Sequence, residues 1–132
     1  MNKTKERIEY WLDTGKYDLD TAKAMLESKR YLYVGFICHL IVEKCIKAYY
    51  WHINNSEPPY IHNLLILSEK STLEKLLTKD QKKLINDLMP LNIQARYPEE
   101  KSILLKTLNY NRCRSLLKKT KEFYQWIEKL LK

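Results

Sequence analysis

Four polar side chains lie in the middle of the largely apolar segment at residues 31–54, and their spacing could support chemistry: His39, Glu43, Lys44 and Lys47. On a helix, Glu43 lies one turn from both His39 and Lys47, so these three side chains can share a face. An unpaired charge in apolar surroundings is costly, and we therefore expect Glu43 to have a partner. That partner is either another helix of the same chain or a ligand. His39 and Glu43 alone lack the further ligands of a usual metal site, so we expect no metal.

Two more candidates lie outside this segment. His62 follows Pro58-Pro59-Tyr60-Ile61, and a histidine that opens a helix is either a cap or packing residue or a ligand contact. Arg96-Tyr97-Pro98 has the composition of an extended or irregular chain. The guanidinium of Arg96 offers a fork of donors suited to phosphate, and Tyr97 could stack on a base. These residues fit either a nucleotide contact or ordinary surface structure.

Positive charge is concentrated at the end of the chain. The net charge is +8, and residues 101–132 hold nine Lys or Arg against Glu122 and Glu128. Such a basic segment could attract phosphate backbones or an acidic partner. A solvated, lysine-rich helix face is the alternative interpretation.

Hydrophobic periodicity indicates the elements that must position these residues. Apolar residues recur at helical spacing over 4–28, 31–54 and 102–131. Gly15 could kink the first helix, and Asn109 or Asn111 could interrupt the last. A short helix is expected to begin at His62 or Asn63, and Thr78 with Gln81 has the spacing of a capping box that starts another. Four long helices and one short helix predict an all-α, antiparallel bundle made of one domain, residues 1–132.

Composition and missing motifs restrict the class of protein. Three cysteines, the lack of an N-terminal apolar signal region and the lack of an apolar stretch long enough for a membrane span favour a reduced, cytoplasmic protein without membrane contact. No glycine-rich phosphate loop, paired-cysteine zinc spacing or Gly-x-Ser-x-Gly element is present. We therefore expect no cofactor and no hydrolase of the usual kinds.

Several segments in order resemble the HEPN domain family. The segment Tyr33-Val34-Gly35-Phe36-Ile37-Cys38-His39-Leu40-Ile41-Val42-Glu43-Lys44-Cys45-Ile46-Lys47-Ala48 is similar to its signature helix. Pro58-Pro59-Tyr60-Ile61-His62-Asn63-Leu64 is similar to its Pro-x-x-His-x-Leu entry to the next helix, and Arg96-Tyr97-Pro98 resembles an element of the minimal HEPN proteins.

The resemblance implies an up-and-down helical bundle, commonly a homodimer and often paired with a minimal nucleotidyltransferase in toxin–antitoxin systems. It also implies similarity to the helical C-terminal domain of kanamycin nucleotidyltransferase. Glu43, Lys44, Lys47, His62, Arg96 and Tyr97 become candidates for contact with a nucleotide or the partner protein. We expect Glu43, Lys44 and Lys47 to share a groove with Arg96 and Tyr97, and His62 is a further candidate for contact.

One departure from the family argues against catalysis. Ribonuclease members carry an arginine followed, after four to six residues, by a histidine, and no arginine of this sequence has a histidine at that offset. The general acid–base residue of that chemistry is therefore missing from its expected place. The sequence predicts a non-catalytic module that binds a nucleotide or RNA, or docks on a nucleotidyltransferase. A degenerate ribonuclease and a purely structural dimerisation protein are the alternatives.

Overall fold

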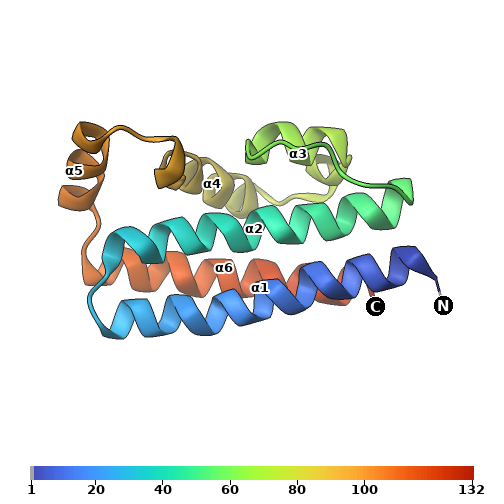
Figure 1. Ribbon diagram of the computed structural model, residues 1–132, viewed down its shortest axis with the longest axis horizontal. Coiled ribbons are helices and arrows are strands. Elements are labelled where there is room, and N and C mark those ends of the chain that lie inside the picture. The colour runs from blue at the N-terminus through green and yellow to red at the C-terminus, as the bar shows by residue number, and fades with distance from the viewer. Residues whose placement is uncertain (1) are drawn as a thin grey trace.

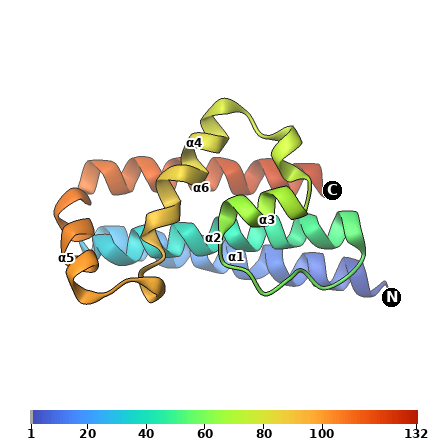
Figure 2. The same cartoon turned by 90° about the horizontal axis from the view of Figure 1, so that it is seen from above.

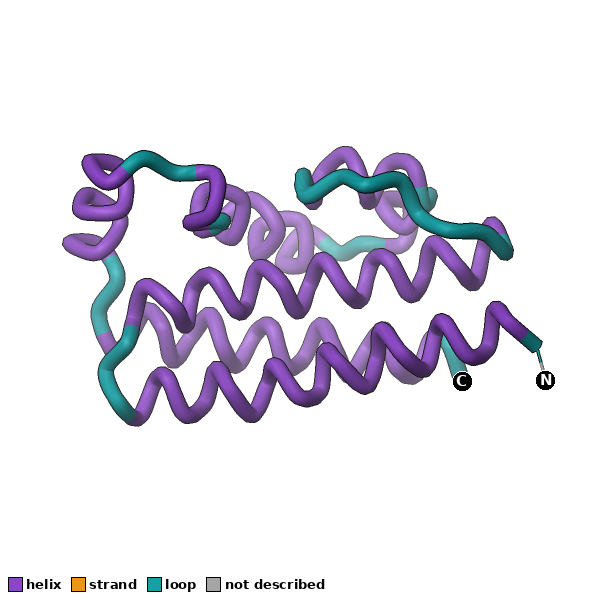
Figure 3. Tube along the Cα trace, in the orientation of Figure 1, coloured by secondary structure: helices purple, strands orange, loops and turns teal. Residues whose placement is uncertain are grey.

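The computed structural model describes residues 2–132, and this part of the chain consists of helices and loops without a strand (Figure 3). Three long helices, α1 (Lys3–Glu27), α2 (Tyr31–Asn54) and α6 (Tyr110–Leu130), run side by side along the molecule (Figure 1). The all-α bundle predicted from the sequence is confirmed. Shorter helices lie on the side of α2 away from α1 (Figures 1 and 2): α3 (Leu64–Lys70), α4 (Lys79–Leu88) and α5 (Pro98–Thr107). Short 3-10 turns occupy Leu73–Leu76, Met89–Leu91 and Ile93–Ala95.

Helix α1 runs without interruption through Gly15, the position at which the sequence left a kink or break open. Its first turn is capped by Asn2, whose Oδ1 accepts a hydrogen bond from the Thr4 amide at 2.9 Å. Gly15 is buried, and a Cβ built there would lie 3.2 Å from Cε2 of Tyr124 on α6. The glycine therefore serves close packing between α1 and α6, and the helix continues through it.

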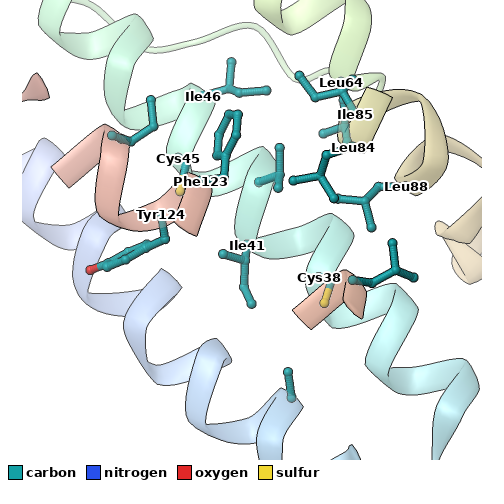
Figure 4. Close-up of a cluster of buried hydrophobic side chains, with 14 of the residues drawn as sticks. Cys38, Ile41, Cys45, Ile46, Leu64, Leu84, Ile85, Leu88, Phe123 and Tyr124 are labelled. Carbon is teal, nitrogen blue, oxygen red and sulfur yellow. The ribbon is translucent and has the colours of Figure 1, made fainter. Parts of the chain in front are cut away.

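Helix α2 is the centre of the molecule and has the predicted bounds, residues 31–54. It packs against α1, α6, α3, α4 and α5, which explains why apolar residues cover most of its circumference. Figure 4 shows side chains from α2, α3, α4 and α6 meeting in one core, with these residues labelled: Cys38, Ile41, Cys45, Ile46, Leu64, Leu84, Ile85, Leu88, Phe123 and Tyr124. The three cysteines are buried free thiols.

Local capping chemistry sets the start of α4, as predicted. The Gln81 amide donates to Thr78 Oγ1 at 3.1 Å, and Gln81 Oε1 accepts from the Thr78 amide at 2.9 Å. These two bonds form the expected capping box. The helix gives way at Met89 to the 3-10 turn that contains Pro90, where proline cannot continue the backbone ladder.

The residues expected to form one last helix, 102–131, are divided between α5 and α6. Leu108 has extended backbone angles and is buried. Asn109 then caps α6, its Oδ1 accepting from the Arg112 amide at 2.8 Å. A helix-compatible sequence is thus interrupted because Asn109 acts as a cap and Leu108 turns inward to the core. Pro98, expected in irregular chain, instead opens α5, as proline can in a first turn.

Candidate functional site

Glu43 is the centre of a buried charge cluster on α2. Only 5% of its surface is exposed. Its carboxylate accepts a hydrogen bond from Lys47 Nζ at 3.0 Å, and His62 Nδ1 lies 3.1 Å from Oε2 and 3.2 Å from Oε1. The expected partner of Glu43 is therefore present twice, once on α2 and once in the segment that leads to α3.

Two aromatic side chains pack against members of the cluster. Lys47 Nζ lies 5.3 Å from the centre of the Trp11 ring on α1, at cation–π distance. The side chain of His62 is 46% exposed, and its ring meets that of Tyr60 edge-on at 4.9 Å. Glu43, Lys47 and His62 thus connect the interior of the bundle to the surface at the segment between α2 and α3.

His39 belongs to the same cluster but is held neutral. Its Nδ1 lies 3.9 Å from Glu43 Oε1. Burial lowers the pKa of His39 to about 4, although the Glu43 carboxylate acts in the opposite direction. Nδ1 is buried and has no hydrogen-bond partner among the described residues. Within residues 2–132, no group of three or more His, Cys, Asp or Glu side chains is arranged to hold a metal ion.

Lys44 points away from this cluster. It forms an ion pair with Asp18 and so ties α2 to α1. Both side chains of that pair are about four-fifths buried, with relative exposures of 22% and 18%. The structure therefore gives Lys44 a place in the α1–α2 contact, and not beside Glu43, one residue earlier on the helix.

Arg96 and Tyr97 are arranged around the start of α5. Arg96 donates from Nε to the Pro90 carbonyl at 3.2 Å and from Nη1 to Glu100 Oε2 at 3.1 Å. The Tyr97 amide donates to Glu100 Oε1 at 3.3 Å, and these bonds lower the pKa of Glu100. Tyr97 is 74% exposed. A small cavity of about 220 Å³ beside Arg96 is lined by Pro90, Arg96, Glu100, Ile103 and Leu104.

The structure brings together some of the candidates and not others. Glu43, Lys47 and His62 form one cluster. Within residues 2–132, no hydrogen bond or ion pair joins Arg96 or Tyr97 to that cluster, and the cavity beside Arg96 has none of the three in its lining. The shared groove expected from the sequence is not supported, because Arg96 is held by Pro90 and Glu100 at the start of α5.

A different groove, about 590 Å³ in volume, runs between α1 and α6. Its floor contains apolar carbon from both helices, and its rim is basic. The cations are Lys16 and Lys23 on α1 and Arg114, Lys118 and Lys121 on α6. The other lining residues are Leu19, Asp20, Leu26, Leu117, Tyr124, Gln125 and Glu128. The hydroxyl of Tyr124 donates to the Leu12 carbonyl at 2.8 Å, so this side chain braces the floor across the two helices (Figure 4).

The five cations of this basic groove are not neutralised by neighbouring acids. All five are exposed, and none takes part in an ion pair among residues 2–132. Only Asp20 and Glu128 supply negative charge to the lining, which leaves three positive charges in excess. A concave site with one dominant sign of charge and an apolar floor attracts anions that also carry an apolar group.

Sequence reasoning identified only half of this groove. The basic excess of residues 101–132 includes Arg114, Lys118 and Lys121, but Lys16 and Lys23 did not stand out in a nearly balanced N-terminal region. Lys16 and Lys23 lie on one face of the first helix, and the three cations of the last helix lie on one face of that helix. This helical spacing is the feature of the sequence that could have indicated the groove. Which helix α6 packs against decides whether the two faces meet.

In the comparison with protein families, the family model of the HEPN domain matches residues 8–130. No curated protein and no solved structure matches the chain. Among residues 2–132, no helix is both long enough and apolar enough to cross a membrane.

Proposed function

This chain belongs to the HEPN domain family, and we propose that it is a non-catalytic module that binds RNA or a nucleotide through the basic groove between α1 and α6. The observation that carries this proposal is the set of five exposed, unpaired cations around an apolar floor. Cations at the rim can neutralise phosphates, and apolar carbon between them can contact a base or ribose.

The position of the histidines supports binding over cleavage. His39 is buried and neutral, and burial places it beyond the reach of a substrate. His62 is oriented by Glu43, and among the described residues no hydrogen bond or ion pair joins an arginine to either histidine. General acid–base catalysis needs a titratable group next to the reacting atoms together with a stabiliser of the developing charge. His62 is a titratable group, but among the described residues no arginine is bonded to it that could stabilise developing charge.

Fluorescence anisotropy with a labelled single-stranded RNA tests the proposal. The variant Lys16→Gln/Arg114→Gln/Lys121→Gln removes three rim charges, and we expect it to weaken binding by at least about tenfold at low salt. The control Lys5→Gln/Lys70→Gln/Lys79→Gln removes the same charge from residues outside the groove. Equal loss in both variants, or no binding by the unaltered protein at high micromolar concentration, would overturn the proposal. The RNA is expected to remain intact throughout.

A second candidate function, docking on a protein partner, is favoured by α5. This helix has no buried residue, and Ile103 and Leu105 on it and Tyr97 at its N-cap are exposed. Apolar and aromatic side chains of this kind are enriched in interfaces. The family resemblance suggests a minimal nucleotidyltransferase or a second copy of this chain. Light scattering of the purified protein, alone and with such a nucleotidyltransferase, should show a complex that Ile103→Asp/Leu105→Asp abolishes; a monomer under both conditions would remove this candidate.

A further inference from the structure

A second cavity lies on the opposite flank of α6. It has a volume of about 580 Å³ and is formed by α4 and α6. Lys118 lines both this α4–α6 cavity and the basic groove. The exposed face of α6 is therefore a ridge with a hollow on each side, and Lys118 stands between the two hollows.

The two hollows differ in charge. The lining of the α4–α6 cavity contains three cations, and Asp80, Asp87 and Glu122 balance their charge. One of these cations, Lys83, forms an ion pair with Asp87 at 2.9 Å. A phosphate is therefore attracted to the basic groove and not to this cavity. Carboxylates do accept hydrogen bonds from the exocyclic amino groups of bases, as from N4 of cytosine. The α4–α6 cavity suits the uncharged part of a nucleotide.

The ridge between the hollows is strongly basic. Arg114, Lys118 and Lys121 share one stripe, with Lys119 beside it, and all four are exposed. Within residues 2–132, none of the four forms an ion pair. A ligand that occupies both hollows must pass over the Lys118 side chain, and a single nucleotide has only one base to place in a hollow.

From these observations we propose that the ligand is a single strand of nucleic acid that crosses α6, with phosphate over Lys118 and bases on both flanks. This inference rests on the proposed function and adds the class of ligand: an oligonucleotide, not a mononucleotide. A duplex cannot place bases in two separate hollows, because its bases are stacked and paired. Amino-bearing bases, such as cytosine and adenine, suit the carboxylates of the α4–α6 cavity better than uracil does.

A length series tests the inference. Binding of CMP, a cytidine dinucleotide, a pentamer and a decamer is measured by competition against the labelled RNA, with a matched DNA series to identify the sugar. We expect the affinity to rise by at least about tenfold from CMP to the pentamer, because the second hollow is engaged by a tethered base. A rise in affinity with length in the RNA series or in the DNA series supports the inference. If the affinity rises with length in neither series, the inference is overturned.

A variant that fills the α4–α6 cavity separates the two hollows. Ser115 is exposed in its lining, and Ser115→Trp should abolish the gain in affinity from CMP to the pentamer. Ser56→Trp, at an exposed position between α2 and α3, is the matched control, and thermal melts verify that both variants fold. If the affinity of Ser115→Trp still rose with length as it does in the unaltered protein, the inference would be overturned. Binding of CMP as tight as that of the decamer would overturn it and leave the proposed function standing, whereas no binding of any nucleic acid would remove both.

Discussion

At the scale of the residue, the cluster around Glu43 shows how a helix at the centre of the bundle accommodates charge. Moving a carboxylate and an ammonium out of water costs several kcal/mol, which their mutual attraction repays only when the geometry is good. Here Glu43 has Lys47 and His62 at hydrogen-bond distance, and the Trp11 ring lies against Lys47. The buried charges of this cluster therefore compensate one another, and removal of one side chain leaves another without its partner.

Removing Lys47 tests this dependence. Lys47→Met should lower the free energy of unfolding by about 3–5 kcal/mol, because Glu43 would remain buried with one partner fewer. Lys83→Met breaks a pair of the same spacing whose lysine side chain is 69% exposed, and its effect should stay below about 1 kcal/mol. Urea unfolding measures both. Similar small losses in the two variants would show that the Glu43 cluster contributes no more than a surface pair.

His39 predicts how stability changes with pH. Its pKa is lowered to about 4 in the folded protein, from 6.5 in an unperturbed side chain. Below pH 6.5 the unfolded chain takes up a proton that the folded chain refuses, so the free energy of unfolding should fall as the pH drops from 6.5 to 4. The total loss in the free energy of unfolding caused by His39 is of the order of 3 kcal/mol, because each unit of pKa difference corresponds to about 1.4 kcal/mol.

Urea titrations at several pH values check the role of His39. His39→Leu should flatten the decline between pH 6.5 and 4, because the titrating group is gone. The exposed His52 serves as the control, and His52→Gln should keep the slope of the unaltered protein. If His39→Leu retained the full slope, another group would be responsible for it.

At the scale of the element, the contact between α1 and α6 sets the geometry of the basic groove. Gly15 permits this contact, since Tyr124 packs where a side chain would be. The Tyr124 ring cannot easily move away, because it is buried and its hydroxyl is bound to the Leu12 carbonyl. The width of the groove floor thus depends on a glycine in one helix and a pinned tyrosine in the other.

Gly15→Ala should therefore destabilise the protein, although alanine favours helices. The gain in helix propensity is about 1 kcal/mol, and overpacking a well-filled contact costs about 1–3 kcal/mol. We expect a net loss in thermal and urea unfolding. In a Tyr124→Leu background the ring is absent, and the same substitution should become stabilising. A stabilising effect in the presence of Tyr124 would contradict the close contact.

At the scale of the whole molecule, local chemistry made most of the fold predictable. The periodicity of α1 and α2 and the Thr78–Gln81 capping box each depend on neighbours within a few residues, and they were predicted. The separation of α5 from α6 was left open, since Asn109 is compatible with a helix interior and with a cap. Only the burial of Leu108 in the core decides between the two.

The candidate site was less predictable for the same physical reason. The partnership of Glu43 with Lys47 follows from helical spacing, whereas that of Glu43 with His62 depends on how the segment between α2 and α3 folds back. The basic groove depends on packing between the first and last helices of the chain. The sequence contains these cations, but it does not indicate that α1 and α6 bring them together.

The salt dependence of single-stranded RNA binding tests phosphate binding in the basic groove most directly. Each phosphate contact contributes about −0.7 to the slope of log affinity against log salt. Lys16→Gln/Lys121→Gln should make the slope shallower by about 1.4, because two contacts are lost. The control Lys5→Gln/Lys70→Gln should retain the slope of the unaltered protein. An unchanged slope in the groove variant, or an equal change in the control, would contradict the assignment of phosphate binding to the groove between α1 and α6.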